Sequence, residues 1–379
     1  MESVQKQYTV LCIVGARPNF MKIAPIMRAM ASSALISPVL LHTGQHYDAD
    51  MKHSFFDQLH IPEPDIDLEV GSGSHAEQTA EIMKRFEPVL DELKPQAILV
   101  VGDVNSTIAC ALVAVKKSIP VVHVEAGLRS GDRAMPEEIN RVLTDQISDL
   151  LFTTEADAVN NLTAEGIQSE RIHFVGNVMI DTLLYNRNRA TPSKETLAQA
   201  GVDLSKGYGM LTLHRPSNVD DPVVLERLLT VLVKLSKQLP LVFPVHPRTR
   251  QRISDMGFDA LLADSSISLL PPLGYLQMLG LMSDATVVLT DSGGIQEETT
   301  ALGVPCITLR ENTERPITLT QGTNVLAGTD VAVIESSFDE ILSTGGRKGI
   351  IPELWDGHAA VRLTRIIESF LDQRQSEHK

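Results

Sequence analysis

The sequence has few aromatic residues, few cysteines and no long apolar run. Aromatic residues make up 4% of the 379 residues, with a single tryptophan. None of the three cysteines forms a Cys-x-x-Cys pair, so we expect neither a disulfide framework nor a zinc site, and free thiols suit the cytoplasm. No apolar run reaches the roughly 20 residues that span a bilayer. The first seven residues lack the apolar core of a signal peptide, so we expect no membrane association.

Positive charge is also in short supply. The chain has 33 basic and 48 acidic side chains, a net charge of −15. This balance argues against a general binder of nucleic acid or of anionic membranes, although a local basic site could still hold a small anion. Metal and dinucleotide motifs are missing as well, because the chain contains no His-Glu-x-x-His, no Walker A loop and no Gly-x-Gly-x-x-Gly after a strand. We therefore expect neither a metal nor a nicotinamide cofactor.

Short apolar segments alternate with longer amphipathic segments along most of the chain. Hydrophobic residues make up 43% of the sequence, as in a globular protein. Such alternation predicts an α/β fold, in which parallel sheets are covered by helices on both faces. The predicted strands are Tyr8–Val14, Ser37–His42, Ala97–Val101, Val121–Glu125, Leu150–Thr153, Ile172–Val175, Met210–Leu213, Leu241–Val245, Ile267–Leu269, Thr286–Thr290 and Cys306–Leu309.

A polar stretch over residues 186–206 interrupts this alternation, and the length of the chain suits two domains. We predict two Rossmann-like, doubly wound domains, one over residues 1–185 and one over residues 186–356. A last helix within residues 357–379 is expected to pack back on the first domain. Because ligands of such sheets bind outside the carboxyl ends of the strands, we expect the two domains to face each other across a cleft.

The stretch Val287–Glu298 is the most informative in the chain. A β-branched run ends at Asp291, Ser292, Gly293 and Gly294 follow, and a helix begins. Glycines let a ligand approach the backbone, and the free N–H groups of a helix start favour an anion such as phosphate. Glu298 lies one turn further, where its carboxylate could accept hydrogen bonds from sugar hydroxyls. The alternative interpretation is an ordinary turn between a strand and a helix.

Basic residues and histidines follow several of the other predicted strands. Arg17 and Lys22 follow the first strand, and the planar guanidinium of Arg17 suits phosphate oxygens. In the second half, His214 and Arg215 follow one strand and His246 follows another. Together with the glycine turn they suggest a diphosphate pocket. Three charged residues in the loop after the last predicted strand could close over the ligand: Glu311, Glu314 and Arg315.

Carboxylates gather at strand ends and helix starts in the first half. Asp103 follows one strand, Glu125 ends the next, and Glu137 opens a helix. Glu125 is the most telling, because a charge at the end of an apolar strand needs a reason. Carboxylates that converge on one site shift one another's pKa values, which suits proton transfer from a weakly acidic C–H bond. His46, in the turn after the second strand, is either a ligand or a structural hydrogen-bonding residue.

Taken together, these residues give the chain a clear family resemblance. From about residue 8 to the last helix, it closely resembles the non-hydrolysing UDP-N-acetylglucosamine 2-epimerases. The motifs that carry the resemblance are Gly15-Ala16-Arg17-Pro18, His42-Thr43-Gly44-Gln45-His46, Gly102-Asp103, His123-Val124-Glu125-Ala126-Gly127-Leu128-Arg129, Pro136-Glu137-Glu138-x-Asn140-Arg141, His214-Arg215 and Asp291-Ser292-Gly293-Gly294-Ile295-Gln296-Glu297-Glu298.

The resemblance implies a fold like that of the GT-B glycosyltransferases and a homodimer without NAD or a required metal. It implies reversible conversion of UDP-GlcNAc to UDP-ManNAc, by elimination of UDP to 2-acetamidoglucal and re-addition. Its product feeds bacterial surface polysaccharide or teichoic-acid linkage synthesis. Asp103 and Glu125 would handle the C2 proton, Glu137 would support positive charge near C1, and His214 would assist the departing diphosphate. The resemblance also implies a wider set of substrate-binding residues: Arg17, Lys22, His46, Arg141, Arg215, His246, Ser292, Gly293, Gly294, Glu298 and Arg315.

The chain departs from the family pattern at several positions. Ala16 and Asn19 stand where many members have Thr and Glu. Some members bind a second UDP-GlcNAc as an activator through two glutamines and a downstream arginine. Here Gln45 keeps the first position as a possible allosteric residue, Asp48 takes the second, and residues 71–83 contain no arginine.

Four other functions remain open at this stage. The chain could epimerise a UDP-2,3-diacetamido uronic acid instead of UDP-GlcNAc. It could be a GT-B glycosyltransferase that uses a UDP-sugar, although a transferase does not need so many carboxylates near the donor C2. It could be a hydrolysing epimerase that releases free sugar. A non-catalytic nucleotide-sugar sensor is the last alternative, and the intact set Asp103, Glu125, Glu137 and His214 argues against it.

Overall fold

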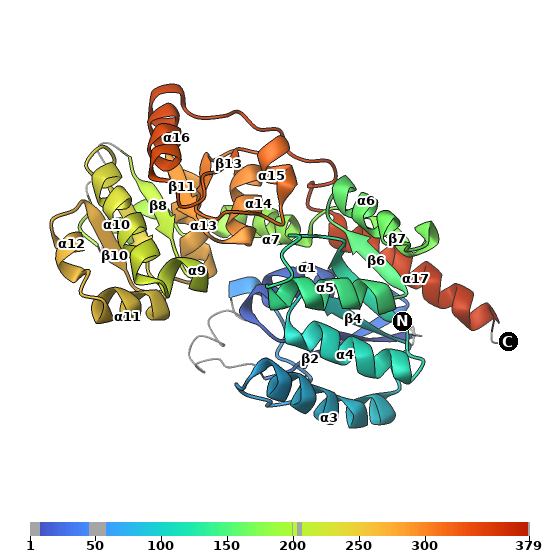
Figure 1. The fold of residues 1–379 in the computed structure, drawn as a ribbon. Coiled ribbons are helices and arrows are strands. Elements are labelled where there is room, and N and C mark those ends of the chain that lie inside the picture. The colour runs from blue at the N-terminus through green and yellow to red at the C-terminus, as the bar shows by residue number, and fades with distance from the viewer. Residues whose placement is uncertain (1–7, 45–57, 199, 203–206, 378–379) are drawn as a thin grey trace. The chain divides into compact units, whose positions relative to one another are not determined.

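The computed structural model of the chain describes residues 8–44, 58–198, 200–202 and 207–377. The chain divides into two compact units (Figure 1). Unit 1 comprises Met1–Tyr185 and Glu353–Lys379, and unit 2 comprises Asn186–Pro352. Each unit contains one parallel β-sheet with helices, which confirms the predicted fold class. No helix in the described ranges is long and apolar enough to cross a membrane.

Seven strands form the sheet of unit 1, in the order β3-β2-β1-β4-β5-β6-β7. All adjacent pairs are parallel. The order reverses between the central strands β1 and β4, so the chain leaves these two strands toward opposite sides. The strands are β1 (Tyr8–Val14), β2 (Ile36–His42), β3 (Ile66–Asp67), β4 (Ala97–Val101), β5 (Val121–Ala126), β6 (Leu150–Thr153) and β7 (Ile172–Phe174).

Helices cover both faces of this sheet. Helices α3, α4 and α5 lie side by side on one face, and α17 packs along α1 (Figure 1). Helix α3 buries Phe86 and Leu90 against Leu11 and Ile98 of the strands, because its apolar residues recur at helical spacing. The helices are α1 (Arg17–Ala31), α3 (His75–Leu93), α4 (Asn105–Lys116), α5 (Pro136–Ile147), α6 (Ala156–Ala164), α7 (Val178–Asn186) and α17 (Ala359–Glu377), with a 3-10 turn at Ser169–Arg171.

The C-terminal segment of the chain belongs to unit 1 and is held there by specific contacts. The Trp355 indole N–H donates to the carbonyl oxygen of Thr154 at 3.0 Å. Asp181 accepts hydrogen bonds from the first backbone N–H groups of α17, at Ala359 and Ala360. Near the other end of α17, the Tyr8 hydroxyl contacts Asp372 at 2.6 Å.

The sheet of unit 2 repeats the same plan with six strands, in the order β10-β9-β8-β11-β12-β13. Its pairs are also parallel, and its order reverses between β8 and β11. The strands are β8 (Gly209–Thr212), β9 (Leu241–Pro244), β10 (Ile267–Leu270), β11 (Val287–Thr290), β12 (Cys306–Thr308) and β13 (Asn324–Leu326).

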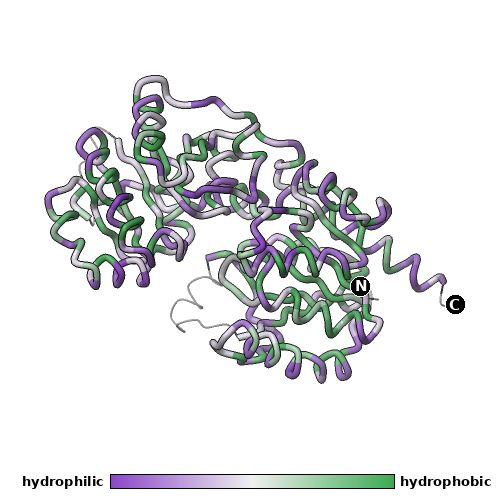
Figure 2. Tube along the Cα trace, in the orientation of Figure 1, coloured by the Kyte–Doolittle hydropathy of each residue, from purple (hydrophilic) through white to green (hydrophobic). Residues whose placement is uncertain are grey.

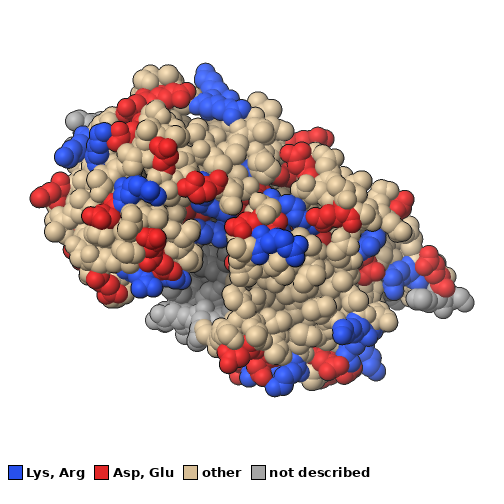
Figure 3. Space-filling model, in the orientation of Figure 1, with Lys and Arg blue, Asp and Glu red and all other residues tan. Residues whose placement is uncertain are grey.

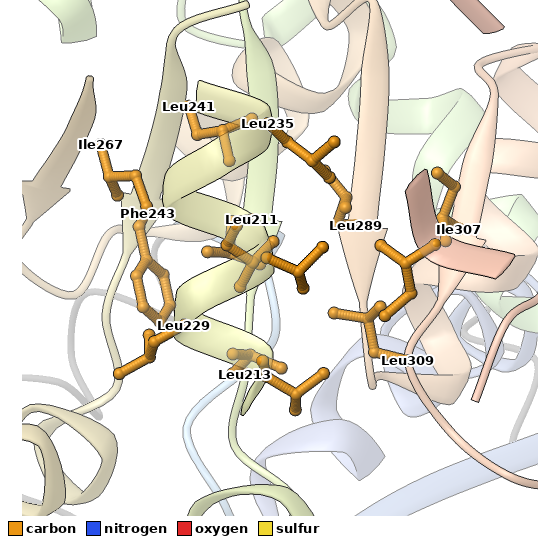
Figure 4. Close-up of a cluster of buried hydrophobic side chains, with 14 of the residues drawn as sticks. Leu211, Leu213, Leu229, Leu235, Leu241, Phe243, Ile267, Leu289, Ile307 and Leu309 are labelled. Carbon is orange, nitrogen blue, oxygen red and sulfur yellow. The ribbon is translucent and has the colours of Figure 1, made fainter. Parts of the chain in front are cut away.

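The core of unit 2 lies between this sheet and the long helix α10. Leu229 and Leu235 of α10 face Leu211, Phe243 and other strand side chains, and all of these are buried (Figure 4). Figure 2 shows hydrophobic residues through the middle of each unit and hydrophilic residues at the outer turns. The helices of unit 2 are α8 (Ser193–Ala198), α9 (Pro216–Val219), α10 (Pro222–Ser236), α11 (Pro247–Asp255), α12 (Asp259–Ala263), α13 (Tyr275–Asp284), α14 (Gly293–Leu302), α15 (Pro316–Thr320) and α16 (Val331–Thr344), with a 3-10 turn at Arg187–Arg189.

The strand order decides where a ligand can bind. At a point where the order of a parallel sheet reverses, the loops after the two central strands turn apart and leave a crevice at their carboxyl ends. In unit 1 this point lies after β1 and β4, and in unit 2 after β8 and β11. The residues that follow these strands are therefore the first candidates for a functional site.

The longer strands begin and end within a residue or two of their predicted bounds, whereas several short or isolated elements have no predicted counterpart. Strand β3 has two residues, too few for a periodic signal. Strand β13 was not predicted either, although β7 and β12, which also have three residues, were. Helix α16 was also missed, although its start and end carry standard signals. Asp330 accepts hydrogen bonds from the Ala332 and Val333 backbone N–H groups, and Gly345 ends the helix in the left-handed conformation.

Candidate active site

A buried ion pair stands at the carboxyl end of the sheet in unit 1. Lys22 lies in the second turn of α1, and Glu125 lies in β5 near its end. The Lys22 Nζ is 2.5 Å from Glu125 Oε2, and both side chains are less than 10% exposed. Glu125 has a φ of +71°, and the register between β5 and β6 shifts beside it. A bulge of this kind turns one side chain away from the regular alternation of the strand.

Asp103 forms a second charged group at the same sheet edge. It follows β4, and its Oδ2 lies 2.5 Å from Arg141 on α5. Arg141 also contacts Glu138 at 2.6 Å, so its buried guanidinium lies between two carboxylates. Glu138 in turn accepts hydrogen bonds from the backbone N–H groups of Ser130 and Gly131. Burial opposes ionisation of Glu138, yet these hydrogen bonds and Arg141 hold its pKa below the ordinary value.

Two small features bring these groups together. Asn19 accepts hydrogen bonds from the backbone N–H groups of Gly15 and Ala16 and donates to the carbonyl oxygen of Val101, which ties the turn after β1 to the end of β4. Gly102 has a φ of +68°, and a Cβ there would lie 3.0 Å from the Lys22 Nζ. Glycine therefore leaves room for the lysine directly beside Asp103.

The other predicted residues of unit 1 either have no described contact with these two ion pairs or lie partly or wholly outside the described residues. Glu137 is half-exposed in the first turn of α5. Arg17 begins α1, but its side chain is not among the described parts. Gln45 and His46 lie outside the described residues. The structure thus brings Lys22 and Glu125 together and joins Asp103 to Arg141.

In unit 2, a buried carboxylate holds the histidine that follows β8. Asp291, fully buried after β11, lies 2.8 Å from His214 Nδ1. It also accepts hydrogen bonds from the backbone N–H groups of His214 and Arg215 and from the Asn218 amide. Burial opposes its ionisation, but the hydrogen bonds and charge of His214 outweigh burial and hold the pKa of Asp291 below its ordinary value. The His214 side chain is 42% exposed, so its Nε2 is the nitrogen left to meet a ligand.

The glycine turn after β11 becomes the start of α14. Ser292 is the N-cap residue, and its side chain makes no capping hydrogen bond. The first backbone N–H groups of this helix therefore carry the partial positive charge that binds anions. Gly293 is buried, and a Cβ there would lie 2.8 Å from Glu314 Oε1, so this position also needs glycine for packing. Gly294 is half-buried.

A network of buried charges supports this turn from the loop after β12. Glu314 lies 2.8 Å from Arg310 and 3.8 Å from Arg215. Burial opposes its ionisation, yet Arg315 and Arg310 hold the pKa of Glu314 well below its usual range. The Arg315 Nε lies 2.7 Å from Glu297 on α14, and both side chains are nearly inaccessible. The ion pairs described for the Arg315 guanidinium are thus with Glu297 and Glu314, two carboxylates of unit 2.

Two further predicted residues of unit 2 have different surroundings. Glu298 is buried on α14 and accepts a hydrogen bond of 2.9 Å from the hydroxyl of Tyr275 on α13. The pKa of Glu298 is raised to about 7, because burial and the charge of Glu297 outweigh the hydrogen bond from Tyr275, which lowers it. His246, exposed after β9, caps α11 by accepting a hydrogen bond from the Arg248 backbone N–H at its Nδ1.

Three residues that shape these groups are not among the predicted site residues: Asp291, Asn19 and Tyr275. Asp291 received no role, although a carboxylate at the end of an apolar strand was the very argument applied to Glu125. Asn19 was noted only as a departure from the family pattern. Tyr275 gave no sequence signal, because only the packing of α13 against α14 brings it to Glu298. In the described part of the chain, no group of three His, Cys, Asp or Glu side chains is placed to hold a metal.

The buried Glu298 leads to a prediction about stability and pH. The unfolded chain releases this proton near pH 4.5, whereas the folded chain holds it to about pH 7. Between these values the unfolded state binds fewer protons, so stability falls as pH rises. Raising the pH from about 5 to about 8 should destabilise the wild type by roughly 2–4 kcal/mol relative to Glu298→Gln. Melting temperatures across this range measure the effect.

The control for this prediction is Glu340→Gln, which removes an exposed carboxylate from α16 of the same unit. This variant should keep the pH dependence of the wild type. If the melting temperatures of the wild type and of Glu298→Gln changed with pH by the same amount, Glu298 would be ionised in the folded protein at all these pH values.

Comparison with known proteins places this chain in a family. The family model for UDP-N-acetylglucosamine 2-epimerase matches residues 28–368. The UDP-N-acetylglucosamine 2-epimerase of Methanococcus maripaludis is 42% identical over 89% of this chain and 92% of its own length. The UDP-2,3-diacetamido-2,3-dideoxy-D-glucuronate 2-epimerase of Pseudomonas aeruginosa is also 42% identical, over 84% of this chain and 89% of its own.

A solved structure shows the same fold. The crystal structure of Methanocaldococcus jannaschii UDP-GlcNAc 2-epimerase in complex with UDP-GlcNAc and UDP matches with a TM-score of 0.87 and 40% identity. The match covers 95% of this chain and 99% of that one. These similarities confirm the resemblance seen in the motifs, and the chain belongs to the UDP-N-acetylglucosamine 2-epimerase family.

Proposed function

We propose that this protein is an isomerase that interconverts UDP-GlcNAc and UDP-ManNAc at C2 of the sugar. In the first step a base takes the C2 proton, the C–H electron pair forms a C1–C2 double bond, and UDP leaves with the electrons of the C1–O bond. The intermediate is 2-acetamidoglucal. In the second step UDP adds back to C1 and a proton reaches the opposite face of C2, so no atom is gained or lost.

The carboxylates of unit 1 supply the proton chemistry in this proposal. Asp103 and Glu125 remove and return the C2 proton, and Glu137 stabilises positive charge that develops near C1. The contact of each base with a cation supports this assignment. Lys22 lies against Glu125 and Arg141 lies against Asp103, so the charged form of each carboxylate has a nearby counter-ion.

The cationic and N–H groups of unit 2 bind the nucleotide in this proposal. The start of α14, at Ser292, Gly293 and Gly294, binds the diphosphate. His214 assists its departure through Nε2, because Asp291 occupies Nδ1. Glu298 contacts the ribose. The residues proposed to complete substrate binding are Arg17, Lys22, His46, Arg141, Arg215, His246 and Arg315.

The observation that carries the proposal is the cluster of paired carboxylates at the reversal point of the unit 1 sheet. A glycosyltransferase that uses a UDP-sugar shares the anion-binding helix start of unit 2, but it has no need of several carboxylates for the C2 proton. Asp103 follows β4 and Glu125 lies near the end of the adjacent strand β5, and both belong to one group of charges around Lys22 and Gly102.

A second substrate has support of its own. The relative from Pseudomonas aeruginosa, named for UDP-2,3-diacetamido-2,3-dideoxy-D-glucuronate, is as similar to this chain as the Methanococcus maripaludis enzyme, at 42% identity. Both substrates react at the same C2–H bond next to the same UDP leaving group. The two nucleotide sugars should therefore be assayed side by side.

The test of the proposal is incubation of the purified protein with UDP-GlcNAc in D2O, followed by proton NMR. We expect UDP-ManNAc, loss of the C2 proton signal in both epimers and no free sugar. Free ManNAc would indicate a hydrolysing enzyme instead. Turnover of the diacetamido uronate alone would assign that substrate. Absence of turnover and of C2 exchange with both sugars would refute the proposal and favour a transferase.

The role of Asp103 can be tested by Asp103→Asn. The amide keeps an oxygen for Arg141 but cannot accept the C2 proton, so kcat should fall about 10²–10⁴-fold while the affinity for UDP changes little. The control is Asp157→Asn, an exposed residue in the first turn of α6, which should keep the wild-type rate. Glucal formation at the wild-type rate in the Asp103 variant would remove this residue from the proton-transfer step.

We further propose that the protein works as a homodimer in the cytoplasm. Its cysteines in the described residues are free and buried, as suits a reducing compartment. The surface over α4 and α5 of unit 1 is largely without charge (Figure 3). Val115 and Leu143 on these helices are 37% and 49% exposed, and neighbouring exposed apolar residues favour association.

The dimer proposal predicts that Leu143→Glu separates the subunits, because a carboxylate would lose its hydration in an apolar interface. Light scattering after size exclusion should give about twice the chain mass of 41.4 kDa for the wild type and a lower mass for the variant. Val223→Glu, at a residue of α10 that is 68% exposed, serves as the control and should keep the wild-type mass. A monomeric wild type would disprove the proposal.

A further inference from the structure

A buried histidine and a buried aspartate lie behind the carboxylate cluster of unit 1. His123 belongs to β5 and Asp145 to α5, and neither side chain is exposed. The His123 Nδ1 lies 2.7 Å from Asp145 Oδ1. On the other side of the ring, Nε2 donates to the carbonyl oxygen of Gly102 at 2.9 Å. Because Gly102 directly precedes Asp103, the ring holds the peptide that carries this carboxylate.

Asp145 extends the same connection to the turn after β5. Its Oδ2 accepts a hydrogen bond of 3.1 Å from the backbone N–H of Gly127, two residues after Glu125. The same oxygen lies 2.8 Å from Arg129, which also binds Glu165 on the outside of the unit. The Asp145 carboxylate therefore links the His123 ring to the turn that follows Glu125.

One residue beside these turns has a backbone conformation that needs such support. Gly102 and Gly127 have φ values of +68° and +79°. Glu125, with a φ of +71°, is in the left-handed region that residues with a side chain rarely adopt. A strained residue keeps its conformation only when the surrounding contacts determine it. The hydrogen bond of His123 ends on Gly102, directly before Asp103, and that of Asp145 ends on Gly127, two residues after Glu125, so both can hold these turns.

We propose that His123 and Asp145 are positioning residues, which hold the turns of Asp103 and Glu125 at the spacing needed for proton transfer at C2. This inference rests on the proposed function. Neither residue need touch the substrate, because both act through the backbone. A displacement of about 1 Å at a reacting group can cost about 10²-fold in rate. The pair should therefore affect kcat and leave UDP binding, which we assign to unit 2, unchanged.

Two substitutions of His123 separate positioning from a purely structural role. The amide nitrogen of Gln can take the place of the ring Nε2 and donate to Gly102, whereas that of Asn takes the place of Nδ1 and faces Asp145. We expect His123→Asn to lower kcat about 10²-fold, with KM within about threefold, because the Asp103 turn is released. His123→Gln should restore kcat to within about tenfold of the wild type, since the contact with Gly102 remains. Both variants lose the same packed ring, so their melting temperatures should fall alike.

Coupling between the two residues gives a second kinetic test. If they act as one unit, Asp145→Asn lowers kcat, and the double variant His123→Asn with Asp145→Asn loses about as much as the worse single variant. His173 on β7 of the same sheet provides the control. His173→Asn also removes a partly buried ring but should keep the wild-type kcat.

Hydrogen–deuterium exchange supplies a measurement that needs no catalytic activity. The backbone amides of residues 102–105 should exchange faster in His123→Asn than in His123→Gln, and those of residues 125–129 faster in Asp145→Asn than in the wild type. Equal exchange rates in all variants would overturn the positioning role. So would a loss of kcat that is the same in His123→Asn and His123→Gln and simply follows the fall in melting temperature. A wild type without turnover would refute the proposed function alone, and the exchange data would still decide whether the pair holds these turns.

Discussion

The reversal of strand order in each parallel sheet is the constraint on which the site depends. In unit 1 the order reverses between β1 and β4, and in unit 2 between β8 and β11. After the two central strands of each sheet, the chain turns to opposite faces. The first residues of these connections therefore line a crevice at the carboxyl end of the sheet. Lys22 and Asp103 in one unit, and His214 and Ser292 in the other, follow these four strands. Polar side chains can gather there without breaking the apolar layers on either face.

The buried ion pairs in these two units are not explained by their contribution to stability alone. A buried ion pair loses hydration energy that its Coulomb attraction only partly returns, and apolar residues of similar size are often as stable or more so. Lys22 with Glu125, and Arg315 with Glu297, are such pairs. The first pair lies at the carboxyl end of the unit 1 sheet, and the second joins α14 to the loop after β12. Apolar residues could have filled both places, so these charges fit a requirement of the proposed reaction.

The two units supply different electrostatic conditions. Unit 1 presents carboxylates that are paired with cations, Glu125 with Lys22 and Asp103 with Arg141, so a proton acceptor lies beside a positive charge. Unit 2 presents the start of α14 and a histidine oriented by Asp291, which suits an anionic leaving group. An elimination needs both conditions, because negative charge moves from the base to the departing diphosphate during the reaction. The division of labour in the proposed mechanism follows from this difference.

Sequence alone determined the fold class, the long strands and the family. Strands such as Ala97–Val101 and Val287–Thr290 are unbroken apolar runs, which only a sheet covered on both faces accommodates. Position after such a strand was also enough to select Asp103, Glu125, His214 and the glycine turn. The two-residue strand β3 could not be predicted, because so short a segment carries no periodic signal and forms only by pairing with β2.

Only the tertiary structure decided which side chains meet. Arg141 lies 38 residues after Asp103 and contacts it, and His214 contacts Asp291, which lies 77 residues further along the chain. His123 contacts both Gly102 and Asp145, although its sequence neighbours only mark it as part of an apolar strand. Periodicity and turn chemistry are local, so they locate a residue on a strand or helix. Ion pairs and hydrogen bonds depend on how those elements pack, and packing is a property of the whole folded unit.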